Sequence, residues 1–422
     1  MVWTRKMEDN SREKEMKRTS SLRVLLVVLV FVSLVGCRAK APAAKSGEPV
    51  TYKIGFIAAI TGGAAFLGEP ERDSATMLQE QINAQGGVKG PDGVMHPVEI
   101  IIHDTEGSGD VAITVVKKLI DDENVIAIIG PTRSPVTMAL IPVMTEAEVS
   151  LISMASSSAI VKPVAERKWI FKVAQSNEHT APWQVEYAKA KGLTRIASLY
   201  VNNAYGEDGA KAIRDTAKAK GVEIVLEETF DAKDTDMTAQ LTKIKASEAQ
   251  AVLVTAIPPA AAIFTKQYRE LGVTLPLIHN SGVAMKPFID LAGAEDAEGV
   301  VFPMGKLVAA DALSDDDPQK AVLQQFMSDY EKHTGNPPST FAGHAWDSVQ
   351  IILKVLETFP DGLSITEQRG KMRDGIEGLQ GLVGVDGVFN FSADDHVGLG
   401  TKDVVLARIT NGDWVYLPQE QW

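Results

Sequence analysis

Short apolar runs alternate along the chain with longer segments in which apolar positions recur every three or four residues. A run of four to eight residues rich in β-branched side chains is typical of a buried strand, and the longer pattern is typical of an amphipathic helix. Strand and helix pairs are predicted at 52–58 and 69–84, 98–103 and 110–122, 125–129 and 134–147, 195–201 and 206–220, 222–228 and 238–246, and 251–255 and 259–271, with a further strand at 150–153. This alternation predicts βαβ units, and therefore an α/β fold of two doubly wound (Rossmann-like) lobes with parallel sheets.

The first helices of the two halves share one pattern of apolar positions. Apolar residues stand at relative positions 0, +3 and +7 in both helices: Ala75, Leu78 and Ile82 in one, and Ala210, Ile213 and Ala217 in the other. Such a stripe packs a helix onto a sheet. Two interpretations stay open: a duplicated unit, or two independent βαβ units that obey the same packing rules.

The amino terminus carries the pattern of an export signal. Residues 24–35 form an apolar run of twelve residues, interrupted only by Ser33, that follows basic residues at positions 17, 18 and 23. A bilayer-spanning helix needs about 20 apolar residues, so this run is too short to be one. A basic segment, a short apolar core and a small residue before a cleavage point form a secretory signal peptide, predicted here at 1–36. A start at Met16 would give a more compact basic segment, so Met16 competes with Met1 as the true start.

The predicted signal ends at the single cysteine of the chain. Leu34-Val35-Gly36-Cys37 resembles the lipobox of bacterial lipoproteins, in which the cysteine is acylated and becomes the first mature residue. The resemblance implies a periplasmic, membrane-anchored lipoprotein with lipidation at Cys37; the alternative is a free cysteine beside an ordinary cleavage site. Two or more acyl chains anchor a protein stably. Residues 37–50 lack apolar periodicity and are predicted to be the lipidated tether.

Composition narrows the class of partner. The 42 Lys and Arg residues against 55 Asp and Glu residues give a net charge of −13, and removal of residues 1–36, with seven basic and four acidic residues, changes it to −16. Nucleic-acid binding needs a basic face, so no nucleic acid is expected as a partner. A single cysteine excludes a disulfide framework. The mature chain is therefore an acidic protein long enough for two lobes.

The sequence lacks the motifs of common enzyme chemistry. It contains no G-x-x-x-x-G-K-[ST] phosphate loop and no G-x-S-x-G nucleophile motif, and its seven histidines show no pair at helical ligand spacing. Residues 107–112 match a loose dinucleotide pattern. However, Glu106 and Asp110 would place carboxylates against a pyrophosphate, so this segment is interpreted as a turn and a helix cap. We therefore expect no enzyme activity, no cofactor and no metal site.

Small polar loops follow the predicted strands at their carboxyl ends, where open α/β sheets bind ligands. In the loop 130–135, Ser134 is predicted to be a helix N-cap and Pro135 the first helical residue, so free backbone N–H groups would face a cleft and suit a carboxylate. The loop 155–158 offers serine hydroxyls, although a serine run also suits a solvated turn. Aromatic residues near loops or helix starts are suited either to cover a ligand or to pack in the core: Phe66, Trp183, Tyr205 and Trp346.

Several segments, taken in order, resemble one known family. They are IGFIAAITGGAAFLGEPERDSATMLQEQINAQGGVKG, AIIGPTRSPVTMALIPV, LYVNNAYGEDGAKAIRD, DTDMTAQLTKIKA and TFAGHAWDSVQIILK. Together they are similar to the solute-binding proteins of ABC importers, in the branched-chain (hydrophobic) amino acid and amide group, and the resemblance extends from Tyr52 to Leu417. It implies a type I periplasmic-binding fold, in which two lobes are joined by a three-strand hinge and the ligand is buried between them. On this pattern lobe 1 comprises 51–174 plus 304–384, and lobe 2 comprises 175–303 plus 385–422.

The resemblance also implies which residues bind the ligand. In the family, two loops of lobe 1 hold the ligand carboxylate, an aromatic residue of lobe 2 closes over it, and further lobe 2 loops lie nearby. Carried over to this chain, and with two of the aromatic residues above added, the predicted ligand-binding residues are Phe66, Thr132, Arg133, Ser134, Ala155, Ser156, Ser157, Tyr205, Ile257, Ser281, Gly282 and Trp346.

One departure from the family bears on the ligand. Branched-chain amino acid binders pair the α-ammonium group with a glutamate of lobe 2, and Ser281 stands near that place here. A desolvated ammonium without a carboxylate loses a charge-assisted hydrogen bond, at a cost of about 1.5–3 kcal/mol. Either another acid, such as Asp347 or Glu207, replaces the glutamate, or the ligand is not an α-amino acid. The sequence GHAWD at 343–347 also resembles family members that take up aromatic or other organic carboxylates.

These features predict an extracytoplasmic solute-binding lipoprotein that captures a small carboxylate-bearing solute by hinge closure. It would deliver the solute to the permease subunits of an ABC importer in the inner membrane. A branched-chain or hydrophobic amino acid is the first expectation, and an aromatic or other organic carboxylate or amide is the alternative. A sensory ligand-binding module is a further alternative, and the protein is expected to be a monomer.

Overall fold

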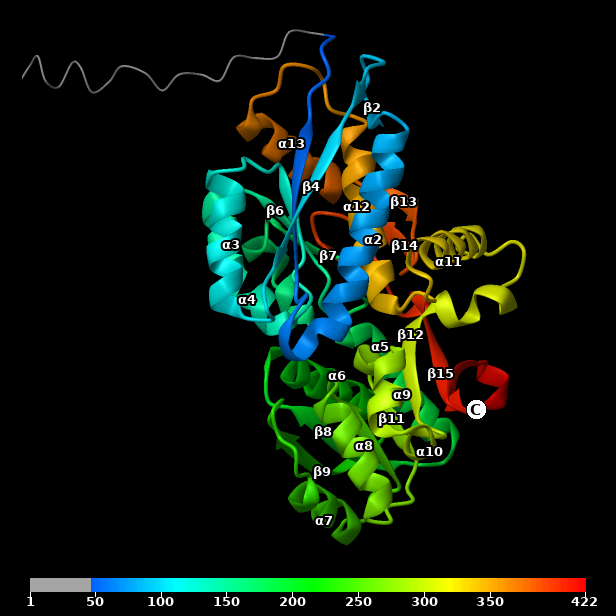
Figure 1. The fold of residues 1–422 in the computed structure, drawn as a ribbon. Helices are drawn as coiled ribbons and strands as arrows, with labels where there is room; N and C mark the ends of the chain where they lie inside the picture. Colours follow the sequence, from blue (N-terminus) through cyan, green and yellow to red (C-terminus); the bar gives the residue numbers. More distant parts are fainter. Residues whose placement is uncertain (1–46) are drawn as a thin grey trace, which may run out of the picture. The chain divides into compact units, whose positions relative to one another are not determined.

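Figure 1 shows the fold of the computed structural model, which describes residues 47–422. The predicted signal peptide, both candidate start residues, Cys37 and all but the last four residues of the predicted tether lie outside the described residues. The described residues belong to one unit of mutually contacting elements. Within them, no helix combines the length and the apolar character needed to cross a bilayer.

Five parallel strands form the first sheet, in the order β4-β1-β5-β6-β7. The strands are β1 (Tyr52–Ala58), β4 (Val98–Asp104), β5 (Ala127–Ile129), β6 (Ser150–Ser153) and β7 (Ile170–Lys172), and the helices between them are α2 (Ala65–Ala84), α3 (Gly109–Asp121) and α4 (Ser134–Ala147). Every residue of β5, β6 and β7 is buried, as expected for parallel strands with both faces covered. A small hairpin of β2 (Val88–Lys89) and β3 (Met95–His96) follows α2.

Seven strands form the second sheet, in the order β16-β15-β12-β11-β10-β8-β9. The strands are β8 (Arg195–Val201), β9 (Glu223–Phe230), β10 (Ala251–Thr255), β11 (Leu277–His279), β12 (Val301–Gly305), β15 (Val404–Thr410) and β16 (Asp413–Leu417). The first five are parallel, and β15 and β16 add an antiparallel edge. The helices of this part are α5 (Asn177–Ala190), α6 (Ala204–Lys220), α7 (Thr238–Ala246), α8 (Ala260–Glu270), α9 (Lys286–Ala292) and α10 (Ala294–Ala297).

The remaining elements return the chain to the first sheet. They are α11 (Lys320–Thr334), α12 (Thr340–Leu356), α13 (Ile365–Glu377) and a small sheet of β13 (Gln380–Val383) with β14 (Val388–Asn390). Helix α12 packs along α2 beside the first sheet, and the two run next to each other in Figure 1. The chain therefore passes between the two sheets in three places: from β7 to α5, from β12 to α11, and from β14 to β15.

The predicted doubly wound α/β fold is confirmed, and several element bounds coincide with the prediction. The strands at 52–58, 150–153, 195–201 and 251–255 and the helices at 134–147 and 238–246 have the predicted ends. Helix α2 begins at Ala65, four residues before the predicted start, because Gly68 lets its first turn touch β1. A Cβ atom on Gly68 would lie 2.2 Å from the carbonyl oxygen of Ala59.

Candidate functional site

A pocket lies where the carboxyl ends of strands from the two sheets meet. It has about 590 Å³ of empty space, part of it open to solvent. Its lining residues follow β5, β6 and β7 of the first sheet and β8, β10 and β11 of the second, and α2 and α12 add others: Leu67, Thr132, Arg133, Ser134, Pro135, Met154, Ala155, Ser156, Gln175, Asn203, Tyr205, Ile257, Ser281, Gly282, Thr340, Phe341 and His344. This is the edge at which open parallel sheets bind ligands.

Nine of the twelve predicted ligand-binding residues line this pocket, and three do not. Phe66 is half-buried and packs against the core of the first sheet. Trp346 packs on Phe326, with ring centroids 6.0 Å apart. Ser157 is fully buried beneath the pocket loop. The structure therefore brings the two predicted loops and the residues of the second sheet together but leaves two of the predicted aromatic residues outside the pocket.

The loop between β5 and α4 is fixed at both ends. Gly130 has a φ of 105°, and a Cβ atom on it would lie 1.9 Å from the carbonyl oxygen of Ile57, so only glycine fits there. The prediction that Ser134 caps α4 is wrong: Arg133 occupies the N-cap position and Ser134 is the first helical residue. The Ser134 hydroxyl instead accepts a hydrogen bond from the backbone N–H of Ser157 at 3.2 Å, which joins the two predicted carboxylate loops.

Thr132 is held by a buried carboxyl group. Its hydroxyl accepts a hydrogen bond from the backbone N–H of Ala59 at 3.0 Å and donates one to Oε2 of Glu71 at 2.5 Å. Burial raises the pKa of Glu71 well above its usual range. Because the single hydroxyl proton of Thr132 is directed at Glu71, the Thr132 hydroxyl has no proton left to donate to a ligand.

Tyr205 extends from the start of α6 into the pocket. Asn203 caps α6 by accepting hydrogen bonds from the backbone N–H groups of Tyr205 and Gly206, at 3.0 and 3.3 Å. The Tyr205 side chain is only 8% exposed; its hydroxyl oxygen faces the backbone N–H of Gly282 and the hydroxyl of Ser281, and its own proton has no acceptor among residues 47–422. Burial raises the pKa of this phenol, so it stays protonated and offers a donor. Gly282 leaves room for it, since a Cβ atom there would lie 2.7 Å from the hydroxyl oxygen.

His344 lines the pocket from α12 and is paired with a second buried acid. Its Nδ1 atom lies 2.6 Å from Oδ2 of Asp386. Asp386 belongs to a turn that Asp347 holds, because the Asp347 carboxylate accepts hydrogen bonds from the backbone N–H groups of Val385 and Asp386, both at 2.7 Å. Burial and the neighbouring Asp386 raise the pKa of Asp347 well above its usual range.

The two acids considered as replacements for a family glutamate do not reach the pocket. Asp347 is fully buried and is occupied by the backbone of the turn at 385–386. Glu207 is exposed on α6, one turn away from the lining residue Asn203. Of the two alternatives that the sequence left open, replacement of the glutamate by Asp347 or Glu207 is therefore not supported, because neither residue lines the pocket.

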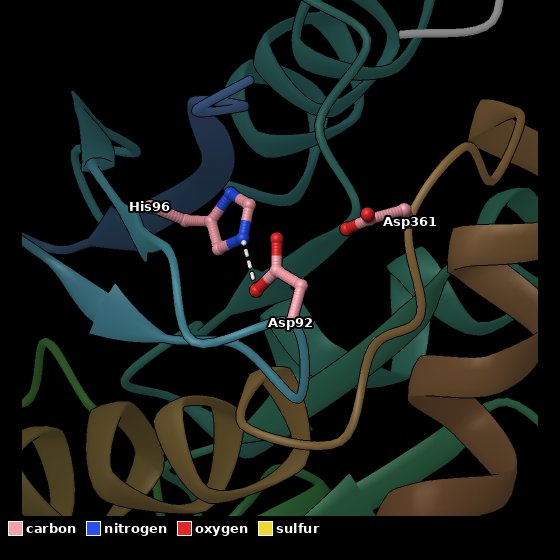
Figure 2. Close-up of side chains that lie close together, drawn as sticks. All are labelled: Asp92, His96 and Asp361. Carbon is pink, nitrogen blue, oxygen red and sulfur yellow. Dashed lines mark ion pairs between the residues drawn. The ribbon is translucent and has the colours of Figure 1, made fainter. Parts of the chain in front are cut away.

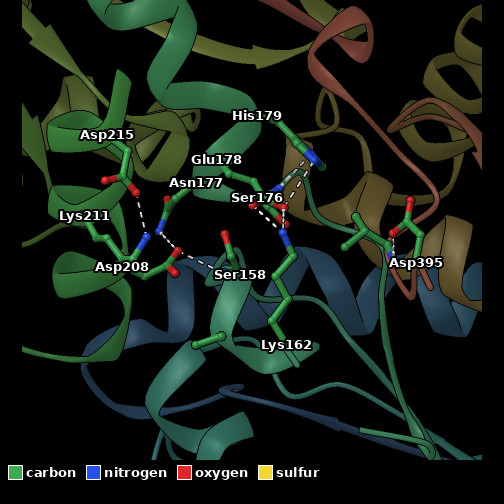
Figure 3. A network of polar contacts seen from close by, with 12 residues as sticks. Ser158, Lys162, Ser176, Asn177, Glu178, His179, Asp208, Lys211, Asp215 and Asp395 are labelled. Atoms are coloured by element: carbon green, nitrogen blue, oxygen red, sulfur yellow. Dashed lines mark hydrogen bonds and ion pairs between the residues drawn. The ribbon is translucent and has the colours of Figure 1, made fainter. Parts of the chain in front are cut away.

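A polar network lies beside the pocket and connects the two sheets (Figure 3). Oδ2 of Asp208, on α6, accepts hydrogen bonds from the backbone N–H of Ser158 at 2.9 Å and from Nδ2 of Asn177 at 2.8 Å. Ser158 follows β6 of the first sheet, whereas Asn177 and Asp208 belong to helices of the second. Lys172, buried at the end of β7, donates to the hydroxyl of Ser176 at 3.0 Å, and burial lowers its pKa to about 7.

Sequence reasoning missed eight lining residues: Leu67, Pro135, Met154, Gln175, Asn203, Thr340, Phe341 and His344. Asn203 had a usable signal, because an asparagine just before Tyr205 and Gly206 is a favourable N-cap. Thr340, Phe341 and His344 lie on one face of α12, at i, i+1 and i+4, and Trp346 lies on another. The sequence GHAWD marks this helix, but the direction of each side chain depends on how α12 packs.

Asp92, His96 and Asp361 form a cluster near the point where the described chain begins (Figure 2). Nε2 of His96 lies 3.5 Å from Oδ1 of Asp92, and Nδ1 of His96 accepts a hydrogen bond from the backbone N–H of Val50 at 3.0 Å. A neutral imidazole has one lone pair, and here the Val50 amide uses it, so Nε2 carries the proton and cannot bind a metal. We assign no metal to this cluster. It attaches residues 47–50 to the β2–β3 hairpin and to the loop between α12 and α13, because the backbone N–H of Gly47 also donates to Asp361.

Two doubly wound sheets, three connecting passes and a pocket of hydroxyl, amide and apolar groups between them define a two-part solute-binding protein. Residues 51–413 match the model of the periplasmic binding protein family, and the chain belongs to that family. It is a binding protein and not an enzyme.

Relatives and solved structures agree with this class. An amino acid binding protein of Pseudomonas aeruginosa is 27% identical over 306 residues, which are 71% of this chain and 76% of that protein. An extracellular ligand-binding receptor from Rhodopseudomonas palustris matches with a TM-score of 0.79 and 27% identity, over 87% of this chain and 99% of that one. The substrate-binding protein of a branched-chain amino acid transporter from Streptococcus pneumoniae, in complex with isoleucine, matches with a TM-score of 0.75 and 27% identity, also over 87% and 99%. The fold is the type I periplasmic-binding fold.

Proposed function

We propose that the protein is the extracytoplasmic solute receptor of an ABC importer and that it captures a small, hydrophobic, carboxylate-bearing solute between two lobes. The proposed lobes are 51–174 plus 304–384 and 175–303 plus 385–422, a division that separates the two sheets apart from the end of β12. The observation that carries the proposal is the pocket, because residues following strands of both sheets line it. The names of the relatives, which refer to amino acids and in one case to isoleucine, support a small-molecule solute of this kind.

The polar side of the pocket suits a carboxylate. Backbone N–H groups of the first turn of α4 have no intrahelical acceptor, and the helix dipole favours an anion at that end. Ser134 and Ser156 line the pocket there together with Arg133, the one arginine among the lining residues. A chain with a net charge of −16 after residue 36 repels anions at long range, so these local groups must provide the attraction.

The apolar side of the pocket suits a hydrocarbon group. Leu67, Met154 and Phe341 line it from the proposed lobe 1, and Ile257 lines it from the proposed lobe 2. A solute with a carboxylate at one end and an apolar group at the other would contact both lobes only when they are closed. Its binding would therefore shift an open and closed equilibrium by its differential affinity for the closed form.

We test the function with a thermal-shift screen of residues 47–422 against aliphatic amino acids, amides, and aliphatic and aromatic acids. A solute at about 1,000 times its Kd adds about 4 kcal/mol to the unfolding free energy, which raises Tm by several degrees. Tyr205→Phe should reduce the shift because it removes the pocket hydroxyl whose proton has no acceptor among residues 47–422. Tyr200→Phe on β8, whose hydroxyl bonds to Glu227 outside the pocket, is the matched control. No shift with any of these classes would refute the proposed receptor role.

The proposed location is the periplasmic face of the membrane, with lipid attached to Cys37 and the permease subunits of the importer as protein partners. The sequence Leu34-Val35-Gly36-Cys37 supports this part of the proposal. Cys37→Ser should release the protein from the membrane fraction of fractionated cells, whereas Lys40→Ala, in the same tether, should leave it there. Retention of the Cys37→Ser protein in the membrane fraction would rule out a lipid anchor at this residue.

A further inference from the structure

The charges at the pocket are unevenly distributed. Arg133 and His344 line it, and among its lining residues in the described part of the chain there is no aspartate or glutamate. Burial lowers the pKa of Arg133, and no carboxylate lies close enough to offset that burial. The hydrogen bond that its guanidinium makes, from Nη1 to the carbonyl oxygen of Gly107 at 3.4 Å, is long and goes to a neutral group. This arginine is therefore available to an anionic ligand.

Each acid near the pocket already has partners in the protein. Glu71 accepts a hydrogen bond from Thr132, and Asp386 is paired with His344. Asp347 binds the backbone at 385–386, and Asp208 binds Ser158 and Asn177. Figure 3 shows Asp208 directed at these two groups. Oε1 of Glu71 has no partner among the described residues, but none of these four acids lines the pocket, so none presents a carboxylate to an ammonium group there.

One further group, the Tyr205 phenol, offers a hydrogen bond to an acceptor atom of a solute. Its oxygen faces the backbone N–H of Gly282 and the hydroxyl of Ser281, so its own proton is left to donate. A carbonyl or carboxylate oxygen of a solute can accept this proton, whereas an ammonium group has no acceptor lone pair and leaves it unused. His344 adds no second donor, because Nδ1 donates to Asp386 and leaves Nε2 of the neutral ring as an acceptor.

We infer that the solute is a hydrophobic carboxylic acid without an amino group, such as a 2-oxo acid or an unsubstituted acid, and not an α-amino acid. This inference rests on the proposed function, because it assumes a carboxylate-bearing solute in the pocket. Arg133 and the first turn of α4 bind the carboxylate. Tyr205 donates to an oxygen of the solute near the position that an α-ammonium group would take in an amino acid.

Isothermal titration calorimetry of residues 47–422 with matched solutes tests the inference without any variant. The aliphatic set is L-leucine, 4-methyl-2-oxopentanoate and 4-methylpentanoate, and the aromatic set is L-phenylalanine, phenylpyruvate and 3-phenylpropanoate. Within each set only the substituent at the α-carbon differs. We expect the tighter amine-free acid of at least one set to bind at least tenfold more tightly than its amino acid.

The outcomes separate this inference from the proposed function. If any of the six acids binds, but no amine-free acid of either set binds at least tenfold more tightly than its amino acid, the inference is overturned and the proposed carboxylate receptor stays intact. If none of the six acids binds, but the uncharged amides 4-methylpentanamide or 3-phenylpropanamide do, both the carboxylate solute and the inference are overturned.

A negative charge placed in the pocket should shift the preference from amine-free acids toward amino acids. Ser281→Glu adds a carboxylate from the side of the second sheet, and we expect the ratio of L-leucine affinity to 4-methyl-2-oxopentanoate affinity to rise at least tenfold. Thr242→Glu adds the same charge on the exposed face of α7, away from the pocket, and should leave the ratio unchanged. Circular dichroism establishes that each variant is folded. An unchanged ratio in folded Ser281→Glu counts against the inference, because the missing carboxylate would then not determine the choice of solute.

Discussion

Asp208 is the acid that links the two proposed lobes beside the pocket. Its Oδ2 atom accepts one hydrogen bond from Asn177, within the proposed lobe 2, and one from the backbone N–H of Ser158, in the proposed lobe 1. If the lobes open and close as proposed, the bond to Asn177, within one lobe, would hold the carboxylate in both forms. The bond to Ser158, between the lobes, would be lost on opening, so it should stabilise the closed form selectively.

Asp208→Asn changes the charge of this group but keeps an acceptor oxygen. A hydrogen bond to a charged group contributes about 1.5–3 kcal/mol, and one between neutral groups about 1 kcal/mol. Because one such bond differs between the open and closed forms, the substitution should destabilise closure by about 1 kcal/mol, or about fivefold in solute affinity. The loss should appear mainly as faster dissociation, since the bond forms after the solute has entered.

Calorimetry and stopped-flow dissociation with the tightest-binding acid of the screen provide the measurement. Asp215→Asn is the matched control, because Asp215 lies on the same helix and pairs with Lys211 at the surface, 2.6 Å away. We expect no change in affinity for the control. If Asp208→Asn binds the solute within twofold of the unmodified protein, or if both variants weaken binding equally, the assignment of Asp208 as a closure contact is refuted.

Two further predictions concern stability. In Gly206→Ala the new Cβ atom would lie 1.9 Å from the carbonyl oxygen of Val201, so the unfolding free energy measured in urea should fall by about 3 kcal/mol. Gly370→Ala, with open space around the new Cβ atom, should not lower it. Equal effects of the two substitutions would contradict the packing argument. Lys172 has a pKa of about 7 in the folded protein and about 10.4 in the unfolded chain. Between these two values the unfolded chain binds one more proton than the folded protein. The unfolding free energy therefore rises with pH, by up to about 1.4 kcal/mol per pH unit. Lys172→Met should lack this rise in urea titrations from pH 7 to pH 9; parallel curves for the two proteins would disprove the argument.

Several strands were predicted with their observed ends, and some of these are buried along their whole length. The run at 251–255 is fully buried as β10, and the neighbouring turns set its ends, so hydrophobicity and turn chemistry agreed there. At Ser134 they disagreed with the structure. A serine before a proline suits a helix cap, but tertiary contact with Ser157 drew the hydroxyl to another loop and left Arg133 at the cap position. A cap preference of about 1 kcal/mol is easily outweighed by such a contact.

For the candidate site too, some residues could be predicted from the sequence and others could not. Residues on loops that directly follow a strand, such as Thr132 and Ser156, were found because the end of a parallel strand is where the ligand site lies. Residues on α12 were not found, because the sequence indicates that this helix is apolar almost all round. Its face toward the pocket, with Phe341 and His344, is fixed by its packing on α2, and Trp346 points elsewhere.

The attachment of the first described residues has a mechanical consequence. Val50 and Gly47 bind to His96 and Asp361 just before β1 begins, whereas the pocket residue Thr132 contacts Ala59, just past the other end of β1. The seven residues of β1 span about 23 Å. A pulling force transmitted through the proposed lipidated tether would first strain the contacts of His96. It would then load β1 in shear against both β4 and β5. The proposed tether would hold lobe 1 at the end of β1 that lies away from the pocket, and lobe 2 would remain free to move. Tension from the membrane would therefore not oppose closure around the solute.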